Sequence, residues 1–185
     1  MSGKVAYEIV PLDRDLHDRA AFACGKEVLN RYLREQAGQD SKRRVAAVFV
    51  ATRPGEPPVL GYYTLSQASV LLDTLPVGQR KRLPRYPSVP VTLMGRLAVH
   101  TSAQRSGLGG LLLGDACRRA AAVADEVASA GILVDAIDDD AVRFYEYFGF
   151  LPFPESPHRL FLPMNTIRDA TSRADSRASN PILPR

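Results

Sequence analysis

The sequence predicts an α+β domain in which a mixed, twisted sheet carries helices on both faces. Strand-like stretches come first along the chain, and strands alternate with helices after about residue 91. Apolar residues make up 45% of 185, as in a globular domain whose core needs no disulfide. We therefore expect one domain over residues 1–164. Residues 165–185 are rich in Ser, Arg and Asp, with little to bury, and predict a disordered tail.

The first half of the chain predicts a strand, a helix and a hairpin. Residues 5–12 (VAYEIVPL) are β-branched and partly alternating, which is typical of a strand. Residues 24–39 carry apolar side chains at helical spacing, and Gly38 is the expected end signal. The turn RPGEPP then joins two strands, which are expected at residues 45–52 and 59–69.

The second half predicts a loop followed by alternating strands and helices. Residues 76–90 hold four prolines, so we expect an irregular loop with at most one helical turn. Residues 91–100 are almost continuously apolar, which predicts a central strand covered on both faces. The elements expected after it are a helix at about 107–128, a strand at 131–136, a helix at 138–149, and closing strands at 150–153 and 158–164.

The charge distribution and the cysteines indicate which partners and which compartment to expect for the protein. The net charge is only +4, yet no Asp or Glu lies between Asp73 and Asp115, a stretch with several Lys and Arg. Such a stretch either attracts polyanions or is simply a solvated basic loop. Cys24 and Cys117 form no CxxC pair, which indicates a reducing compartment. With no leader-like or membrane-spanning run and no metal site in view, a cytoplasmic protein is expected.

A glycine-rich segment follows the expected central strand. It lacks the lysine of a Walker A loop, and Leu112 stands where a Rossmann fingerprint needs its third glycine. Gln104-Arg-Ser-Gly107-Leu-Gly109 instead satisfies the pattern Q/R-x-x-G-x-G/A. Backbone N–H groups of residues 105–110, at a helix N-terminus, would suit a diphosphate. The alternative is a turn that only packs a helix on a strand.

Flanking motifs give this loop a context. GRLAV stands upstream and AVRFYEYFGF downstream, and over residues 5–163 the set resembles the acetyl-CoA-binding core of the GNAT N-acetyltransferases. The resemblance implies acetyl-CoA as cofactor, with its pantetheine along the backbone of Leu97, Ala98 and Val99. One of these N–H groups would polarise the thioester carbonyl. The residues implied around the diphosphate are Gln104, Arg105, Ser106, Gly107, Leu108, Gly109 and Gly110.

The same resemblance also implies which residue acts as the general acid. Tyr145, in RFYEYFGF, matches the family tyrosine that protonates the departing thiolate. Many relatives carry Asn at the start of this helix, next to the pantetheine, where the present chain has Asp139 or Asp140 instead. No general base stands out. An α-amino group has a pKa near ~8, so part of it is already neutral at cytoplasmic pH.

The N-terminal half points to a subgroup. F-x-C-G at Phe22–Gly25 and L-N-x-Y-L at Leu29–Leu33 resemble the first helix of TacT- and AtaT-type GNAT toxins, which acetylate aminoacyl-tRNA and stop translation. The resemblance also implies a ribbon-helix-helix antitoxin and a homodimer. A tRNA needs phosphate contacts. The candidates are Lys42, Arg43, Arg44, Arg80, Lys81, Arg82 and Arg85.

Two other interpretations stay open on the sequence. The chain could be a metabolic or protein acetyltransferase that acts on another amine, since the fold alone does not choose a substrate. It could also be a degenerate relative that only binds coenzyme A or nucleic acid, although Tyr145 and the intact glycine loop argue against that.

Overall fold

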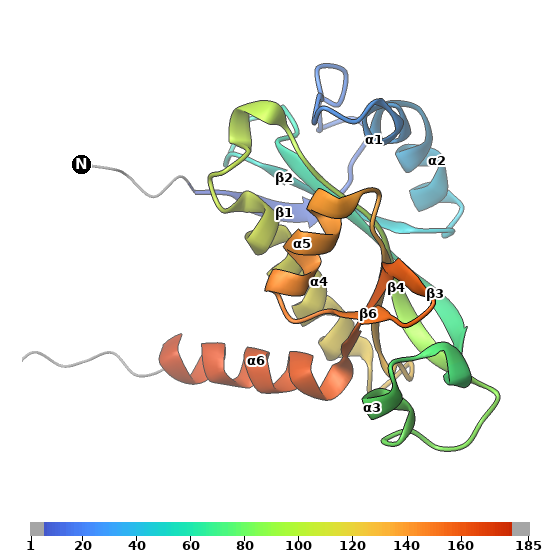
Figure 1. Cartoon of the computed structure of the whole chain (residues 1–185). Coiled ribbons are helices and arrows are strands. Elements are labelled where there is room, and N and C mark those ends of the chain that lie inside the picture. Colours follow the sequence, from blue (N-terminus) through green and yellow to red (C-terminus); the bar gives the residue numbers. More distant parts are fainter. Residues whose placement is uncertain (1–5, 179–185) are drawn as a thin grey trace, which may run out of the picture. The chain divides into compact units, whose positions relative to one another are not determined.

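A computed structural model describes residues 6–178 of the chain. In that range one sheet has the strand order β1-β2-β3-β4-β5-β7-β6, and helices accompany it (Figure 1). The expected α+β class with a mixed sheet is confirmed. The strands are β1 (Glu8–Pro11), β2 (Ala47–Thr52), β3 (Gly61–Leu71), β4 (Ser88–Val99), β5 (Gly131–Asp135), β6 (Leu151–Phe153) and β7 (Ser156–Pro163). The α-helices are α1 (Glu27–Arg31), α2 (Ala37–Lys42), α3 (Val77–Arg80), α4 (Leu108–Val123), α5 (Asp139–Tyr147) and α6 (Met164–Ala178).

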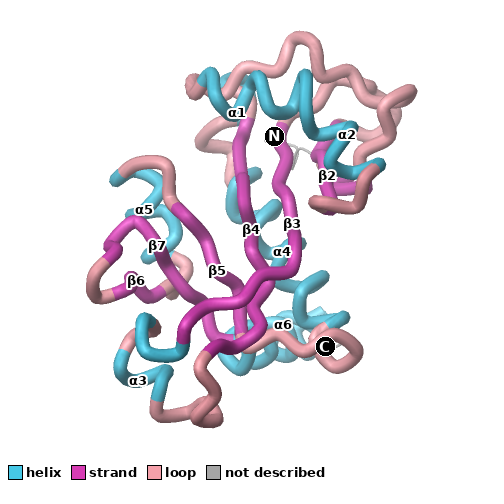
Figure 2. The backbone as a smooth tube through the Cα atoms, turned by 90° about the vertical axis from the view of Figure 1, so that its right-hand side faces the viewer, coloured by secondary structure: helices cyan, strands magenta, loops and turns pink. Residues whose placement is uncertain are grey.

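The chain forms two compact units, the first of residues up to 66 with 94–116, and the second of residues 67–93 with 117 onward. The long strands β3 and β4 run side by side and contribute one part to each unit (Figure 2). The expectation of a single domain over residues 1–164 stays a prediction.

The first unit is built around the antiparallel strands β1, β2 and β3 and the helices that follow β1. Antiparallel pairing places Val50 opposite Val10 on one side and opposite Tyr62 on the other. The segment between α1 and α2 places Tyr32 and Leu33 on this sheet, where they join Val50 and Tyr62 in one core. Burial of these aromatic and aliphatic side chains is the main force that holds the helices in place.

A π-helical segment, Tyr32–Gln36, joins α1 to α2. The sequence predicts one regular helix that ends near Gly38, and this was wrong: Gly38 lies inside α2, where a Cβ would come within 2.8 Å of the Arg14 side chain. Arg19 Nη1 donates to the Leu33 carbonyl at 3.1 Å. Wide π turns often mark functional positions in helices.

The second unit packs β5, β6 and β7 against the start of β4. β5 and β7 pair antiparallel from Gly131 opposite Pro163 to Asp135 opposite Arg159. The core here includes Val91, Leu133 and Phe161. α5 contributes Tyr145, whose ring packs at a centroid distance of 5.3 Å from that of Phe150.

The expected boundaries differ from the observed ones in three places. β4 begins at Ser88, inside the expected loop, and α4 ends at Val123 rather than near residue 128. The expected disordered tail is instead helix α6 over Met164–Ala178, because Ile167 is 2% exposed and Arg168 pairs with Asp125 at 2.6 Å. The remaining part of that prediction, residues 179–185, lies outside the described residues. In the described part of the chain, no helix combines the length and apolarity that a bilayer span requires.

Candidate active site

The glycine loop turns sharply between β4 and α4. Arg105 and Gly107 both have positive φ, at 61° and 86°, and no atom lies within 4 Å of where a Gly107 Cβ would stand. A side chain at this φ is strained, so glycine is favoured here for its backbone rather than for lack of space. Leu108 is buried and fixes the first residue of α4. The first amides of α4 have no partner within the helix, which leaves them available to an anion.

The Gln104 side chain joins this loop to two other segments of the first unit. Its Nε2 donates to the carbonyls of Cys24 at 3.0 Å and Val99 at 3.1 Å. Both protons of the carboxamide NH2 are therefore used within the protein. Gln104, expected among the residues that hold the diphosphate, is placed by its side chain as a positioning residue that fixes where the loop begins.

The Ser106 hydroxyl is also used inside the fold. It donates to the Ala103 carbonyl at 2.6 Å, and the Tyr7 hydroxyl lies 3.1 Å from its oxygen. Because Ser106 has one proton to donate, Tyr7 is the donor of the second bond. What Ser106 can still offer an anion is its backbone N–H.

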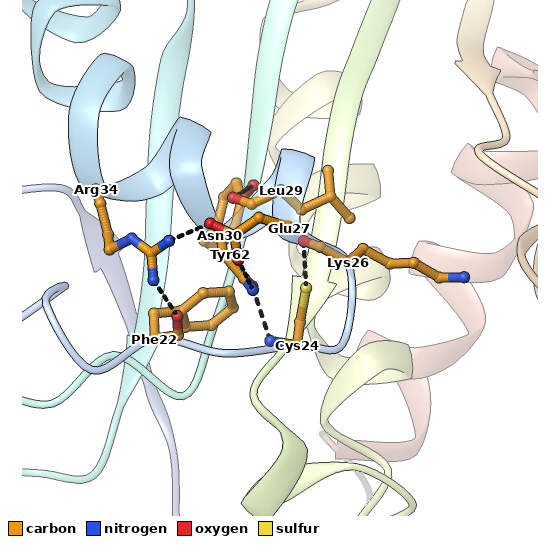
Figure 3. A network of polar contacts seen from close by, with 8 residues as sticks. All are labelled: Phe22, Cys24, Lys26, Glu27, Leu29, Asn30, Arg34 and Tyr62. Atoms are coloured by element: carbon orange, nitrogen blue, oxygen red, sulfur yellow. Dashed lines mark hydrogen bonds and ion pairs between the residues drawn. The ribbon is translucent and has the colours of Figure 1, made fainter.

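The segment before α1 is held by a chain of polar contacts (Figure 3). Asn30, a buried residue, accepts from the Cys24 amide at 2.8 Å and donates to Glu27 at 3.1 Å. Glu27 pairs with Arg34 at 2.5 Å, and Arg34 donates to the Phe22 carbonyl at 3.4 Å. The hydrogen bond from Asn30 lowers the pKa of Glu27, and Arg34 lowers it further. Through Cys24, this chain continues to Gln104 and the glycine loop.

The end of β4 carries the backbone expected to receive the thioester. Leu97 and Val99 are partly buried and Ala98 is buried. After the strand, His100 donates its backbone N–H to the Leu60 carbonyl at 2.8 Å, and its Nδ1 accepts from the Ser102 amide at 3.1 Å. His100 therefore caps the turn that leads into the loop, a structural role rather than that of a base.

Tyr145, in the second unit, lies in a setting that fits an acid. Its side chain is 6% exposed, and burial raises the pKa of the phenol above its ordinary value. Within residues 6–178 its hydroxyl makes no hydrogen bond, and its oxygen is not one of the fully buried polar atoms. The ring is thus fixed by its aromatic neighbours, while the proton is held firmly and remains open to a ligand.

The acidic start of α5 is occupied by structural contacts. Asp138 caps the helix by accepting from the Ala141 amide at 2.9 Å. Asp139 contacts His158 Nε2 at 2.7 Å, and Asp140 pairs with Arg143. The two carboxylates that stand where relatives often carry Asn are therefore engaged at the surface by His158 and Arg143.

The basic candidates divide between the two units. Lys42, Arg43 and Arg44 are exposed at the end of α2 in the first unit, where Arg44 adopts a φ of 59°. The other candidates follow α3 in the second unit, where Lys81, Arg82 and Arg85 are exposed. Arg80 differs, because its Nε is buried without a hydrogen-bond partner in the described part of the chain.

Sequence reasoning missed one residue of this region, Arg96 on β4. Its guanidinium lies 3.6 Å from the centroid of the Tyr32 ring. The only signal was indirect: Arg96 and Tyr32 both belong to motifs that carried the resemblance. Among the described residues, no cluster of three His, Cys, Asp or Glu side chains could hold a metal ion.

Comparison with known proteins defines the class first. Residues 45–152 match the model of the acetyltransferase (GNAT) domain. This match spans more than half of the chain and includes β4, the glycine loop and Tyr145. The chain belongs to the GNAT acetyltransferase family.

The relatives are more specific. The chain is 37% identical to a tRNA-acetylating toxin of Mycobacterium tuberculosis, over 83% of this chain and 90% of the toxin. It is 33% identical to the probable toxin TacT of Sinorhizobium fredii, over 86% of this chain and 92% of that protein. Among solved structures, AtaT complexed with acetyl-methionyl-tRNAfMet superposes with a TM-score of 0.83 at 29% identity, covering 90% of this chain and 99% of AtaT. A tyrosine-to-phenylalanine mutant of AtaT, bound to acetyl-CoA and the C-terminus of the antitoxin AtaR, superposes with a TM-score of 0.77 at 27% identity. The match covers 90% of this chain and 98% of the AtaT chain.

Proposed function

We propose that this GNAT acetyltransferase is a toxin of the cytoplasm that transfers the acetyl group of acetyl-CoA to the α-amino group of an aminoacyl-tRNA, and so blocks translation. The observation that carries the proposal is its similarity, over most of its length, to toxins named for tRNA acetylation. The exposed basic side chains near α2 and after α3 support a polyanionic substrate.

The glycine loop is suited to hold the diphosphate of acetyl-CoA. Its backbone at Gly107 is open to an approaching group, and the helix macrodipole of α4 places about half a positive charge behind it. Gln104 holds the loop against β4 and the segment before α1, so little ordering is left to be done on binding. When bound, the thioester supplies an activated acyl group.

The remaining roles fall to β4, to Tyr145 and to the substrate itself. A backbone N–H at Leu97 or Ala98 donates to the carbonyl oxygen as negative charge develops on it. Tyr145 gives its hydroxyl proton to the departing sulfur, the nitrogen releases a proton to solvent as the amide forms, and the phenol regains its proton from solvent. Because the α-amino group has a pKa near ~8, its neutral form is sufficiently populated to act as nucleophile without a dedicated base.

The proposal includes two partners. One is an antitoxin of the ribbon-helix-helix class, as the AtaT complex with AtaR suggests by similarity. The other is a second copy of the chain, in a homodimer. Light scattering of the purified protein tests for the homodimer, and co-purification with a ribbon-helix-helix protein tests for the antitoxin.

The test of the reaction is to incubate the protein with labelled acetyl-CoA and total charged tRNA and to identify the N-acetylated amino acid. We expect Tyr145→Phe to lower kcat at least about 100-fold, the range for loss of a general acid, while keeping the fold because the ring packing remains. Tyr147→Phe is the matched control, since Tyr147 lies on the same helix and is 84% exposed.

Two outcomes would contradict the proposal. Labelling of free amines or proteins but not of charged tRNA would favour an ordinary acetyltransferase. Full activity in the Tyr145→Phe variant would remove the acid assignment while leaving the substrate assignment intact.

A further inference from the structure

Within residues 6–178, Arg96 is a partly buried cation without a counter-ion. It is partly buried on β4, and among the described residues its guanidinium makes no ion pair and no hydrogen bond. Its one defined contact is the face of the Tyr32 ring, 3.6 Å from the centroid. Partly buried cations in proteins are usually paired. Because Arg96 has no such partner within residues 6–178, the five N–H donors of its guanidinium are available to an anion from outside the chain.

The surroundings of Arg96 fix its position. Tyr32 donates its hydroxyl to Asp40 at 3.0 Å, and its ring stacks with that of Tyr62 at 6.2 Å. Burial, followed by Asp40, raises the pKa of Tyr32 to about 12, with Arg96 opposing the shift. The ring therefore remains a neutral phenol, and the cation–π contact holds the guanidinium of Arg96 over it.

The place of Arg96 on the strand relates it to the reaction. Side chains alternate along a strand, so Arg96 and Ala98 lie on the same face. Ala98 belongs to the core with Tyr32 and Tyr62, which confirms that this is the face toward α1 and the π-helical segment. Arg96 also directly precedes the backbone of Leu97 and Ala98, to which the proposed function assigns the thioester carbonyl.

We propose that Arg96 binds the phosphodiester next to the terminal adenosine of the aminoacyl-tRNA. This inference rests on the proposed function and identifies which part of the substrate the guanidinium recognises. In an aminoacyl-tRNA the carboxylate of the amino acid is esterified and carries no charge. The closest anion to the reacting amine is then the phosphodiester of the terminal nucleotide. A guanidinium held in place over a ring can offer two parallel N–H groups to such an anion.

A cycle of two changes, one in the substrate and one in the protein, tests the assignment. The substrates carry the amino acid found in the labelling experiment, either on adenosine or on the dinucleotide cytidylyl-adenosine, which adds one phosphodiester. We expect the wild-type kcat/KM to be about tenfold or more higher with the dinucleotide, as for a charge-assisted hydrogen bond. Arg96→Gln should remove most of this preference and leave the rate with aminoacyl-adenosine within about twofold.

Three controls separate a recognition role from a structural one. Arg53→Gln removes one exposed positive charge of the first unit and should keep the preference. Tyr32→Phe keeps the ring under Arg96, so this variant should also keep the preference for the dinucleotide. Acetyl-CoA affinity of the Arg96→Gln variant, measured by calorimetry, should equal that of the wild type.

The outcomes decide between the two proposals. If wild type and Arg96→Gln show the same preference for the dinucleotide, the role of Arg96 is overturned although the reaction stands. Loss of acetyl-CoA affinity in Arg96→Gln would also overturn it, since the guanidinium would then serve the other substrate. If the wild type acetylates neither aminoacyl compound nor charged tRNA, the proposed function itself fails, and the inference with it.

Discussion

At the scale of single residues, Tyr145 combines a fixed ring with a proton that leaves only to a ligand. Its ring packs against Phe144 and Phe150, each at a centroid distance of 5.3 Å. Burial raises the pKa of the phenol because the phenolate would be poorly solvated there. An acid with a high pKa is a weak donor in general, but exclusion of water also raises the pKa of the departing thiol, which brings the two groups closer in basicity.

This pKa has a consequence for the pH dependence of the reaction. A general acid acts in its protonated form, so its contribution is lost as pH rises through its pKa. With that pKa raised above 10, we expect kcat/KM to rise toward a plateau above about pH 8, where the amine is neutral, and not to fall by pH 9.5. Single-turnover rates at short times, with circular dichroism at each pH as a check on folding, measure the profile. A descending limb that begins below pH 9 would contradict the assignment of Tyr145.

At the scale of elements, the N-terminus of α1 is tied to the glycine loop through a series of polar contacts. Asn30 satisfies the Cys24 amide, and the Cys24 carbonyl in turn accepts from Gln104. Removing the Asn30 side chain leaves a partly buried N–H without a partner, which costs the desolvation free energy of that group. The position of the loop should then become less well defined.

We expect Asn30→Ala to lower the free energy of unfolding by about 1–3 kcal/mol and to weaken acetyl-CoA binding. Urea unfolding and calorimetry are the measurements. Asn165→Ala is the matched control: Asn165 is exposed, its side chain accepts a hydrogen bond from the adjacent amide, and its loss should cost no more than about 0.5 kcal/mol. Unchanged acetyl-CoA affinity in a destabilised Asn30→Ala protein would show that the contact stabilises the helix without positioning the loop.

Elements with a strong local pattern could be predicted from the sequence, and those fixed by distant contacts could not. The glycine motif and the RFYEYFGF helix were found because their residue types are dictated locally. Helix α6 was not, since its few buried side chains, such as Ile167, gain from contacts that the local sequence does not reveal. The π-helical segment is likewise held by a distant contact, the hydrogen bond from Arg19 to the Leu33 carbonyl. The role proposed for Arg96 depends on the Tyr32 ring, which belongs to another element.

At the scale of the whole molecule, the positive charge is modest in sum and local in placement. The net charge is +4, yet one exposed basic group follows α2 in the first unit and another follows α3 in the second. Each phosphate that such a group neutralises releases counter-ions, so tRNA binding should weaken as salt rises. The two groups can be tested separately, because they lie in different units.

We expect neutralisation of the exposed group in the second unit to flatten the salt dependence of tRNA binding. The slope of log K for tRNA binding against log[salt] is negative, and its magnitude should decrease by about 0.7 to 0.9 for each phosphate that the protein no longer neutralises. Filter binding from low to physiological salt measures it. The variant replaces Lys81, Arg82 and Arg85 by Gln; Arg80 is kept because its Nε is buried. A second variant replaces Lys42, Arg43 and Arg44, and the control replaces the ion-paired Arg53, Arg143 and Arg159. All three variants remove the same number of positive charges. Equal slopes in all of them would therefore mean that only net charge matters. A slope of smaller magnitude in only one of the two exposed groups would show which group contacts the tRNA.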